Sequence, residues 1–169
     1  QNPIEYEGTF PLPEAQLDRF LLKLSLGYPS AEEEGQILLN LQRQHPVLAV
    51  HQVVDGARLL DLQRLVWEVH VDDTVRDYIV RLVTATRRHG DLALGASTRG
   101  SLALFKAAQA LASLRGRDYV LPDDVKDLSV PALAHRLIVR PESALRGYTA
   151  NRILDELLQT VPLQIGEQQ

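Results

Sequence analysis

The sequence contains no cysteine and no methionine, and each absence has a consequence. Without cysteine, the chain forms no disulfide and offers no thiolate ligand to a metal ion. A reducing cytoplasm is compatible with that composition. Because a complete translated chain begins with methionine and this one begins with Gln1, we expect a processed or excised piece of a longer protein.

Long apolar runs and an excess of one charge are also missing. No stretch approaches the roughly 20 apolar residues of a membrane-spanning helix, and no signal peptide opens the chain. The 18 basic and 22 acidic residues are interspersed and give a net charge of -4, which argues against a general nucleic-acid surface. We therefore expect a cytoplasmic protein with no membrane span and no nucleic-acid partner.

A phosphate-binding loop of the Walker A type is absent as well. Such a loop needs Gly-Lys followed by Ser or Thr, because its backbone N–H groups and its lysine ammonium hold the phosphates. The lysines of this chain are Lys23, Lys106 and Lys126, and they follow leucine, phenylalanine and valine. We therefore expect that the chain alone does not hydrolyse ATP.

What the sequence does contain is enough apolar residues for a core, 45% of the chain, in mainly helical patterns. Ser30 and Glu33 form a capping box, Asp72 or Asp73 can begin a later helix, and Pro131 is expected to break another. A short strand is predicted over Val47–Val54. Helices are predicted over residues of about 30–44, 61–69, 73–89, 97–114, 122–135 and 149–160. Residues 137–139 are predicted to be extended.

The first 27 residues have a different character. Pro13 suits the first turn of a short helix through Phe20. An apolar run of strand length, Leu21–Leu26, then ends at Gly27. One strand cannot bury itself, so residues 1–27 are predicted to be the remnant of an α/β layer. Residues 28–169 are predicted to form a helical bundle, and the fold class is mainly α.

Several strings in this order resemble the MoxR-type AAA+ ATPases, and the resemblance spans nearly the whole chain. They are Gln1-Asn2-Pro3, Leu12 to Phe20, Gly95 to Arg99, Arg115 to Val120 with Pro122 to Val125, and Ala134 to Leu137. The resemblance implies that residues 1–27 are the end of the ATPase core, with sensor 1, the arginine-finger helix and the last strand. Residues 28–169 would be the AAA lid domain.

The resemblance also implies a function for the longer protein. Such proteins form rings, usually hexamers, in the cytoplasm and act as chaperone-like factors that couple ATP binding and hydrolysis to remodelling or maturation of a partner. The partner is often a von Willebrand factor A domain protein or a metal-containing enzyme. ATP and Mg²⁺ would be bound by the intact protein through residues outside this chain, and the chain itself would require neither.

Arg19 matches the arginine finger of this family. A guanidinium from a neighbouring subunit stabilises the charge that spreads over the oxygens of a phosphoryl group during transfer. The ordinary alternative is a solvated arginine in the last turn of a short helix, where a cation is mildly favoured.

Arg99 matches sensor 2, and its position is unusual on physical grounds. It lies in the first turn of a predicted helix, where a cation faces the positive end of the helix dipole. A bound phosphate reverses that disadvantage, since helix N-termini and arginine both attract anions. The alternative is an exposed arginine paired with an acid. The string departs from the family at Thr98, where proline is common, and at Gly100, where alanine is common.

Asn2 matches sensor 1, the polar residue that orients the attacking water. Glu14 and Asp18 flank Arg19 and either fix its direction or are helix-surface acids. Ile153-Leu154-Asp155-Glu156 resembles the end of a Walker B strand, but its apolar spacing favours a helix. The histidines have no metal-binding spacing, and His135 is expected to hold a turn of the lid together.

Two alternatives to the ATPase function remain open at this point. One is a helical protein-interaction adaptor without a nucleotide role, and the other is a helix-turn-helix DNA-binding domain. The second is suggested by the helices that flank Gly116 and Pro122, but Asp118, Asp123, Asp124 and Asp127 surround Arg115 and Arg117 and would repel phosphates.

Overall fold

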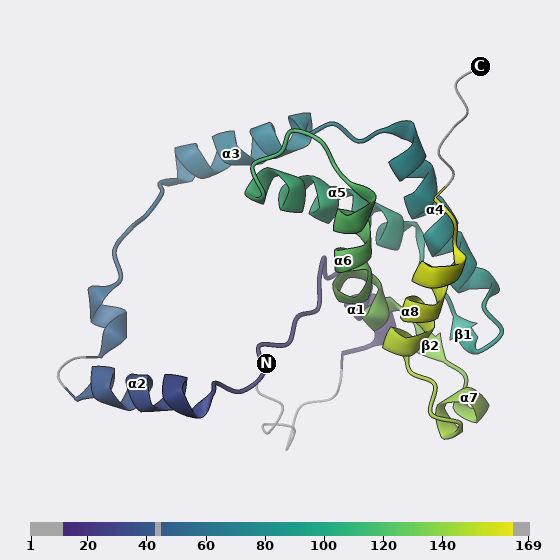
Figure 1. Ribbon diagram of the computed structural model, residues 1–169, viewed down its shortest axis with the longest axis horizontal. Coiled ribbons are helices and arrows are strands. Elements are labelled where there is room, and N and C mark those ends of the chain that lie inside the picture. Colours follow the sequence, from purple (N-terminus) through teal and green to yellow (C-terminus); the bar gives the residue numbers. More distant parts are fainter. Residues whose placement is uncertain (1–11, 43–44, 164–169) are drawn as a thin grey trace. The chain divides into compact units, whose positions relative to one another are not determined.

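The chain divides into two structural units in a computed structural model that describes residues 12–42 and 45–163 (Figure 1). The main unit comprises Gln1–Lys23 and Val66–Gln169, and the inserted unit comprises Leu24–Leu65. The fold is mainly helical, as predicted, and the strands of the described residues form one small sheet.

The first long helix of the main unit, α4 (Asp73–Arg88), begins at Asp72, one of the two predicted caps. The Asp72 carboxylate accepts hydrogen bonds from the backbone N–H and the hydroxyl of Thr74, at 2.8 Å and 2.6 Å. Apolar residues at helical spacing then point inward. The buried residues of α4 are Val75, Tyr78, Ile79, Leu82, Val83 and Thr86.

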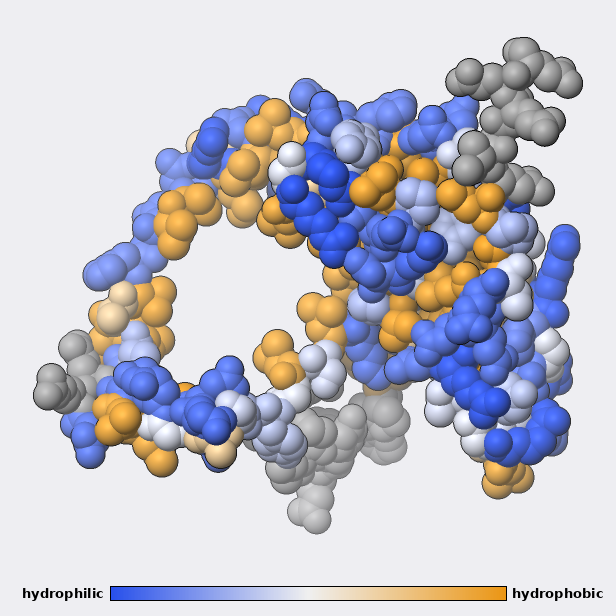
Figure 2. Space-filling view, viewed as in Figure 1, coloured by the Kyte–Doolittle hydropathy of each residue, from blue (hydrophilic) through white to orange (hydrophobic). Residues whose placement is uncertain are grey.

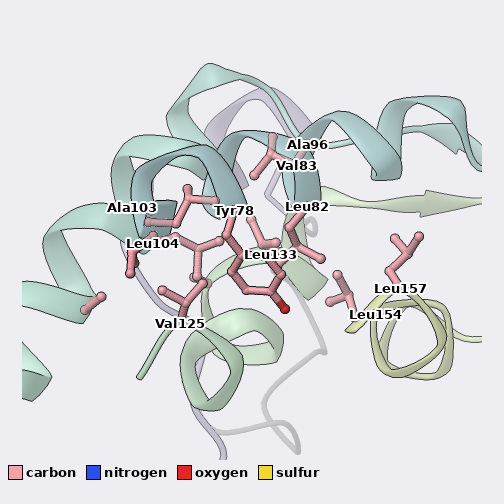
Figure 3. Close-up of a cluster of buried hydrophobic side chains, with 14 of the residues drawn as sticks. Tyr78, Leu82, Val83, Ala96, Ala103, Leu104, Val125, Leu133, Leu154 and Leu157 are labelled. Atoms are coloured by element: carbon pink, nitrogen blue, oxygen red, sulfur yellow. The ribbon is translucent and has the colours of Figure 1, made fainter. Parts of the chain in front are cut away.

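Three further helices complete the core of the main unit: α5 (Thr98–Leu114), α6 (Pro122–Leu133) and α8 (Ala150–Thr160). Ser97 and Thr149 cap α5 and α8 with side-chain oxygens, and Gly116 ends α5 with a φ of 72°. Figure 3 shows the apolar side chains that these helices and α4 turn toward one another. The core forms because each helix has one apolar face.

Pro131 does not break α6, contrary to the prediction. The helix continues through it to Leu133 and then tightens into a 3₁₀ turn, η2 (Ala134–Arg136). The carbonyl of Pro131 accepts a hydrogen bond from the Lys23 backbone N–H at 2.9 Å. A proline removes only the hydrogen bond that its own nitrogen would donate to the carbonyl four residues earlier, and here the helix continues for two residues beyond that loss.

A two-stranded antiparallel sheet joins α4, α5 and η2. Strand β1 (Leu92–Leu94) pairs with β2 (Ile138–Val139), with Leu92 opposite Val139. The extended segment over 137–139 was predicted, whereas β1 and the short helix α7 (Pro141–Leu145) were not. Gly95, which follows β1, passes so close to α4 that a Cβ would lie 2.6 Å from the Arg87 Cα. Glycine is therefore required where the chain returns from the sheet to α5.

The first helix of the described residues, α1 (Glu14–Leu17), is shorter than predicted. The strand predicted over Leu21–Leu26 is wrong for this structure: no regular element forms there, and Leu26 is fully exposed. A strand needs a neighbouring strand to pair with, and among the described residues none pairs with this segment, although Lys23 donates one backbone hydrogen bond to Pro131. The apolar composition alone does not make the strand.

In the inserted unit, α2 (Ala31–Leu41) starts at the predicted capping box of Ser30 and Glu33. The strand predicted over Val47–Val54 is wrong, because Pro46 starts a 3₁₀ turn, η1 (Pro46–Ala49). Helix α3 (Gly56–Glu68), which extends into the main unit, starts earlier than predicted. Its first turn is capped by Asp55, whose carboxylate accepts from the Arg58 N–H at 2.7 Å, and not by Asp61.

Apolar side chains are exposed on α2 and α3, as Figure 2 shows in orange. Examples are Leu38, 68% exposed, and Leu60, 56% exposed. Among the described residues, no helix combines the length and the apolar character that crossing a membrane requires.

The Tyr78 hydroxyl is buried and finds no hydrogen-bond partner among the described residues (Figure 3). Burial raises the pKa of this phenol. Tyr78→Phe is therefore expected to leave the free energy of unfolding unchanged or to raise it by up to about 1–2 kcal/mol, since an unpaired buried hydroxyl is costly. Urea unfolding of both proteins measures this, with Tyr119→Phe at an exposed tyrosine as the control. A clear loss of stability would mean that the hydroxyl has a partner.

Candidate functional site

Asp18 lies directly after α1, where the turn that follows this helix contacts α5 and η2. Both of its carboxylate oxygens accept from the Ser97 hydroxyl, at 3.2 Å and 3.0 Å. The Arg136 guanidinium donates to one oxygen at 3.1 Å, and an Arg99 nitrogen lies 3.6 Å from the other. One carboxylate thus contacts the cap of α5, the first turn of α5 and η2.

Arg136 holds the turn that follows α1. Its side chain is only 3% exposed. Its Nε donates to the Ala132 carbonyl at 2.8 Å and one terminal nitrogen to the Phe20 carbonyl at 2.6 Å, while the other donates to the Asp18 carbonyl. Burial lowers the pKa of Arg136, and the Asp18 charge opposes that shift. Because the guanidinium is almost fully used by these acceptors, the turn is fixed against η2.

His135, beside Arg136, adds a further contact to the same turn. Its Nε2 lies 3.2 Å from the Phe20 carbonyl oxygen. Burial lowers the pKa of His135, opposed by that hydrogen bond. A neutral imidazole donating from Nε2 fits this geometry. The turn that His135 contacts is the one after α1, in the predicted core remnant, whereas the prediction placed this role at a turn of the lid.

Arg99 starts α5 with its guanidinium largely free. Ser97 caps the helix, its hydroxyl oxygen accepting from the Arg99 backbone N–H at 3.2 Å. The Arg99 side chain is 52% exposed, and the 3.6 Å approach to Asp18 is its shortest charged contact among the described residues. An exposed ion pair of that length contributes at most about 1 kcal/mol, so the guanidinium is available to a stronger anion.

Arg19 and Arg99 line one hollow of the main unit, with a volume of ≈ 310 Å³. Four of the lining side chains are cationic (Arg19, Arg99, Lys106 and Arg136), and one, Asp18, is anionic. Lys106 lies on α5, and its Nζ lies 5.1 Å from the centre of the Trp67 ring. The excess of positive charge suits a polyanion.

Comparisons with known proteins identify relatives of this chain. The family described as AAA lid domain matches residues 84–157, and the family described as ATPase family associated with various cellular activities matches residues 1–22. Chaperone MoxR1 of Mycobacterium tuberculosis is 41% identical over 96% of this chain and 45% of its own length. The uncharacterized protein YeaC of Bacillus subtilis is 47% identical over 98% of this chain and 52% of its own.

A solved structure shows the same fold. A candidate ATPase from Cytophaga hutchinsonii matches with a TM-score of 0.89 and 33% identity, over 97% of this chain and 52% of that one. The chain belongs to the MoxR-type AAA+ ATPases. It spans about half the length of the relatives it matches.

Two of the three predicted MoxR-type site residues lie in the described structure, and they lie together. Arg19 and Arg99 face the same hollow, whereas Asn2 lies outside the described residues. Asp155 and Glu156 lie on α8, so the Walker B alternative is excluded by helical geometry, as expected. Within residues 12–42 and 45–163, no group of three or more potential ligands is arranged to hold a metal ion.

Sequence reasoning missed the importance of Arg136 at this MoxR-type site. The motif that contains it, Ala134 to Leu137, contributes to the family resemblance, but the sequence predicted a role only for His135. The available signal was a charged residue among apolar neighbours, because a guanidinium in such a stretch is buried only when acceptors surround it. No pattern in the sequence indicates that its acceptors are carbonyls of Asp18 and Phe20, more than 110 residues away.

Proposed function

We propose that this chain is the lid and sensor-2 region of an ATPase, in which ATP binding and hydrolysis drive chaperone-like remodelling of a partner protein. The observation that carries the proposal is the shared hollow of Arg19 and Arg99. Residues 1–27 would be the end of the ATPase core, and residues 28–169 the lid. The longer protein would supply the phosphate-binding loop that this chain lacks.

The residues of the hollow fit the polyphosphate of a nucleotide. Arg19, Arg99 and Lys106 each have an exposed cationic side chain, and two of these are forked guanidinium groups suited to phosphate oxygens. Only Asp18 opposes them. We propose that both arginines of one subunit serve the same nucleotide, because they line the same hollow.

Each arginine would have its own task at that nucleotide. ATP supplies the phosphoryl group that is transferred to water. Arg19 would neutralise the charge that develops on the phosphoryl oxygens, and Arg99 would bind the terminal phosphate more strongly than its product. Because Arg99 starts α5, a change at this phosphate would move the helix and the core packed against it. Mg²⁺ would be held by the phosphates and by residues outside this chain.

The partner proposals are those that the family resemblance implies. A relative is named a chaperone, which supports a remodelling role. We propose, by analogy with the family, a ring of six subunits in which Arg19 reaches a nucleotide held by a neighbour. A von Willebrand factor A domain protein or a metalloenzyme would be the client.

The test is Arg99→Ala in the natural protein that joins this chain to a nucleotide-binding loop. Losing one preorganised donor at a transferring group is expected to lower kcat for ATP hydrolysis by about 10²–10³-fold. Arg88→Ala is the matched control, because Arg88 is exposed at the end of α4 and lines a different hollow. Unchanged turnover in Arg99→Ala, with lost partner binding after changes on α2 or α3, would favour the adaptor function instead.

A further inference from the structure

Asp18 is the one carboxylate that lines the cationic hollow, and it contacts parts of the main unit that carry both arginines. It directly precedes Arg19 in the sequence. Through the Ser97 hydroxyl, at 3.2 Å and 3.0 Å, it also reaches the cap of the helix that Arg99 begins. A rigid link between two such side chains is what a shared anion site requires, because binding groups work only when they are held in place.

The carboxylate of Asp18 does not depend on Arg99 for its own stability. Its side chain is 22% exposed, and Arg136 donates to it at 3.1 Å from a nearly buried guanidinium. The contact with Arg99 is longer, 3.6 Å, and Arg99 is 52% exposed. When Arg99 leaves, Asp18 keeps its hydrogen bonds from Arg136 and Ser97, so the departure leaves no buried charge unpaired.

From this arrangement we infer that Asp18 is a positioning residue for the proposed ATP site. It fastens the turn that carries Arg19 to the start of α5, and it holds Arg99 in place until a phosphate arrives and takes over that guanidinium. The inference rests on the proposed function, and it adds to it a residue that contacts no nucleotide. It also explains why a carboxylate is present in a hollow that is otherwise cationic.

The test is Asp18→Asn in the natural protein, which removes the charge and keeps the shape of the side chain. We expect kcat for ATP hydrolysis to fall about 10- to 100-fold, because the turn that carries Arg19 is held less firmly against the start of α5 and Arg99 loses its ion pair. We expect KM for ATP to stay the same or to fall, because a negative charge next to a polyanion has been removed. A side chain that merely supported the fold would not lower kcat while it tightened binding.

Two further readouts do not depend on turnover. Inorganic tripolyphosphate should bind the Asp18→Asn chain of 169 residues more tightly than the unchanged chain, by titration calorimetry. The Lys23 amide, which donates to the Pro131 carbonyl at 2.9 Å, should exchange its hydrogen faster, because the turn is less firmly held. Asp18→Glu keeps the negative charge, so this variant should bind tripolyphosphate with the same affinity as the unchanged chain.

Glu14→Gln is the matched control, since Glu14 is an exposed carboxylate on the same short helix. This variant should leave kcat, KM for ATP and the rate of hydrogen exchange at the Lys23 amide unchanged. If Asp18→Asn behaves like Glu14→Gln while Arg99→Ala abolishes turnover, this inference is wrong and the proposed function stands. If Arg99→Ala has full turnover, the proposed function itself is wrong.

Discussion

Asp124→Ala is expected to lower the free energy of unfolding of the chain by about 3–5 kcal/mol, because it breaks a buried ion-pair network. The Asp124 side chain is fully buried and accepts from Arg115 at 2.7 Å, from Arg117 at 2.8 Å and 2.6 Å, and from the Leu121 backbone N–H at 2.8 Å. Its loss leaves the Arg117 guanidinium, 19% exposed, with the Tyr119 carbonyl as its one remaining hydrogen-bond acceptor among the described residues.

Asp127→Ala is the matched control for this prediction. Asp127 pairs with the same Arg115 at 2.8 Å, but its side chain is 54% exposed. An exposed pair contributes at most about 1 kcal/mol, so this variant should unfold at nearly the urea concentration of the unchanged chain. Equal losses in the two variants would contradict the assignment of the stability to the buried carboxylate.

The contribution of Asp124 should disappear in acid. Burial alone would raise its pKa, but hydrogen bonds from Arg117, Leu121 and Arg115 and the charge of Arg117 outweigh burial, so its pKa lies below the ordinary 3.8. A carboxyl with a lowered pKa stabilises the fold above the pKa of the unfolded state, and this stability is lost as the pH falls through the folded value. The difference in free energy of unfolding between the unchanged chain and Asp124→Ala should therefore be constant near neutrality and shrink below about pH 4.

The elements that sequence reasoning predicted well are those with a local cause. Asp72, Ser97 and Thr149 cap their helices with side chains that lie within a few residues of the N–H groups they accept from. Gly116 ends α5 through a backbone conformation that glycine adopts freely. These signals are complete within one turn of chain, so the sequence alone is sufficient to predict them.

The features that were missed depend on contacts between distant parts of the chain. Leu21–Leu26 has the composition of a strand but no partner among the described residues, and β1 is a strand because β2 lies beside it. At the site, the two arginines were predicted from family motifs, while their common hollow was not. It exists because Arg136 binds the carbonyls of a turn 115 to 118 positions earlier in the sequence.

Arg19→Ala is expected to have the largest effect on catalysis, a loss of about 10³–10⁵-fold in kcat for ATP hydrolysis by the natural protein. The charge on a transferring phosphoryl group is spread over its oxygens, and an arginine finger is the group that neutralises it. Arg64→Ala, at an exposed arginine of α3 paired only with Asp61 at 3.3 Å, should retain normal turnover. Normal turnover in Arg19→Ala would show that Arg19 is not the arginine finger.

Mixed rings then test whether Arg19 and Arg99 serve one nucleotide. If they do, each Arg19→Ala subunit and each Arg99→Ala subunit spoils the site that it serves, so a mixture of the two variants has no intact site and stays inactive. If the two arginines serve different nucleotides, some interfaces in the mixture combine an intact Arg19 with an intact Arg99 from the adjacent subunit, and turnover returns. Energy transfer between dyes attached to the two variants shows that their subunits exchange into common rings. Because both side chains line one hollow of the main unit, we expect no recovery.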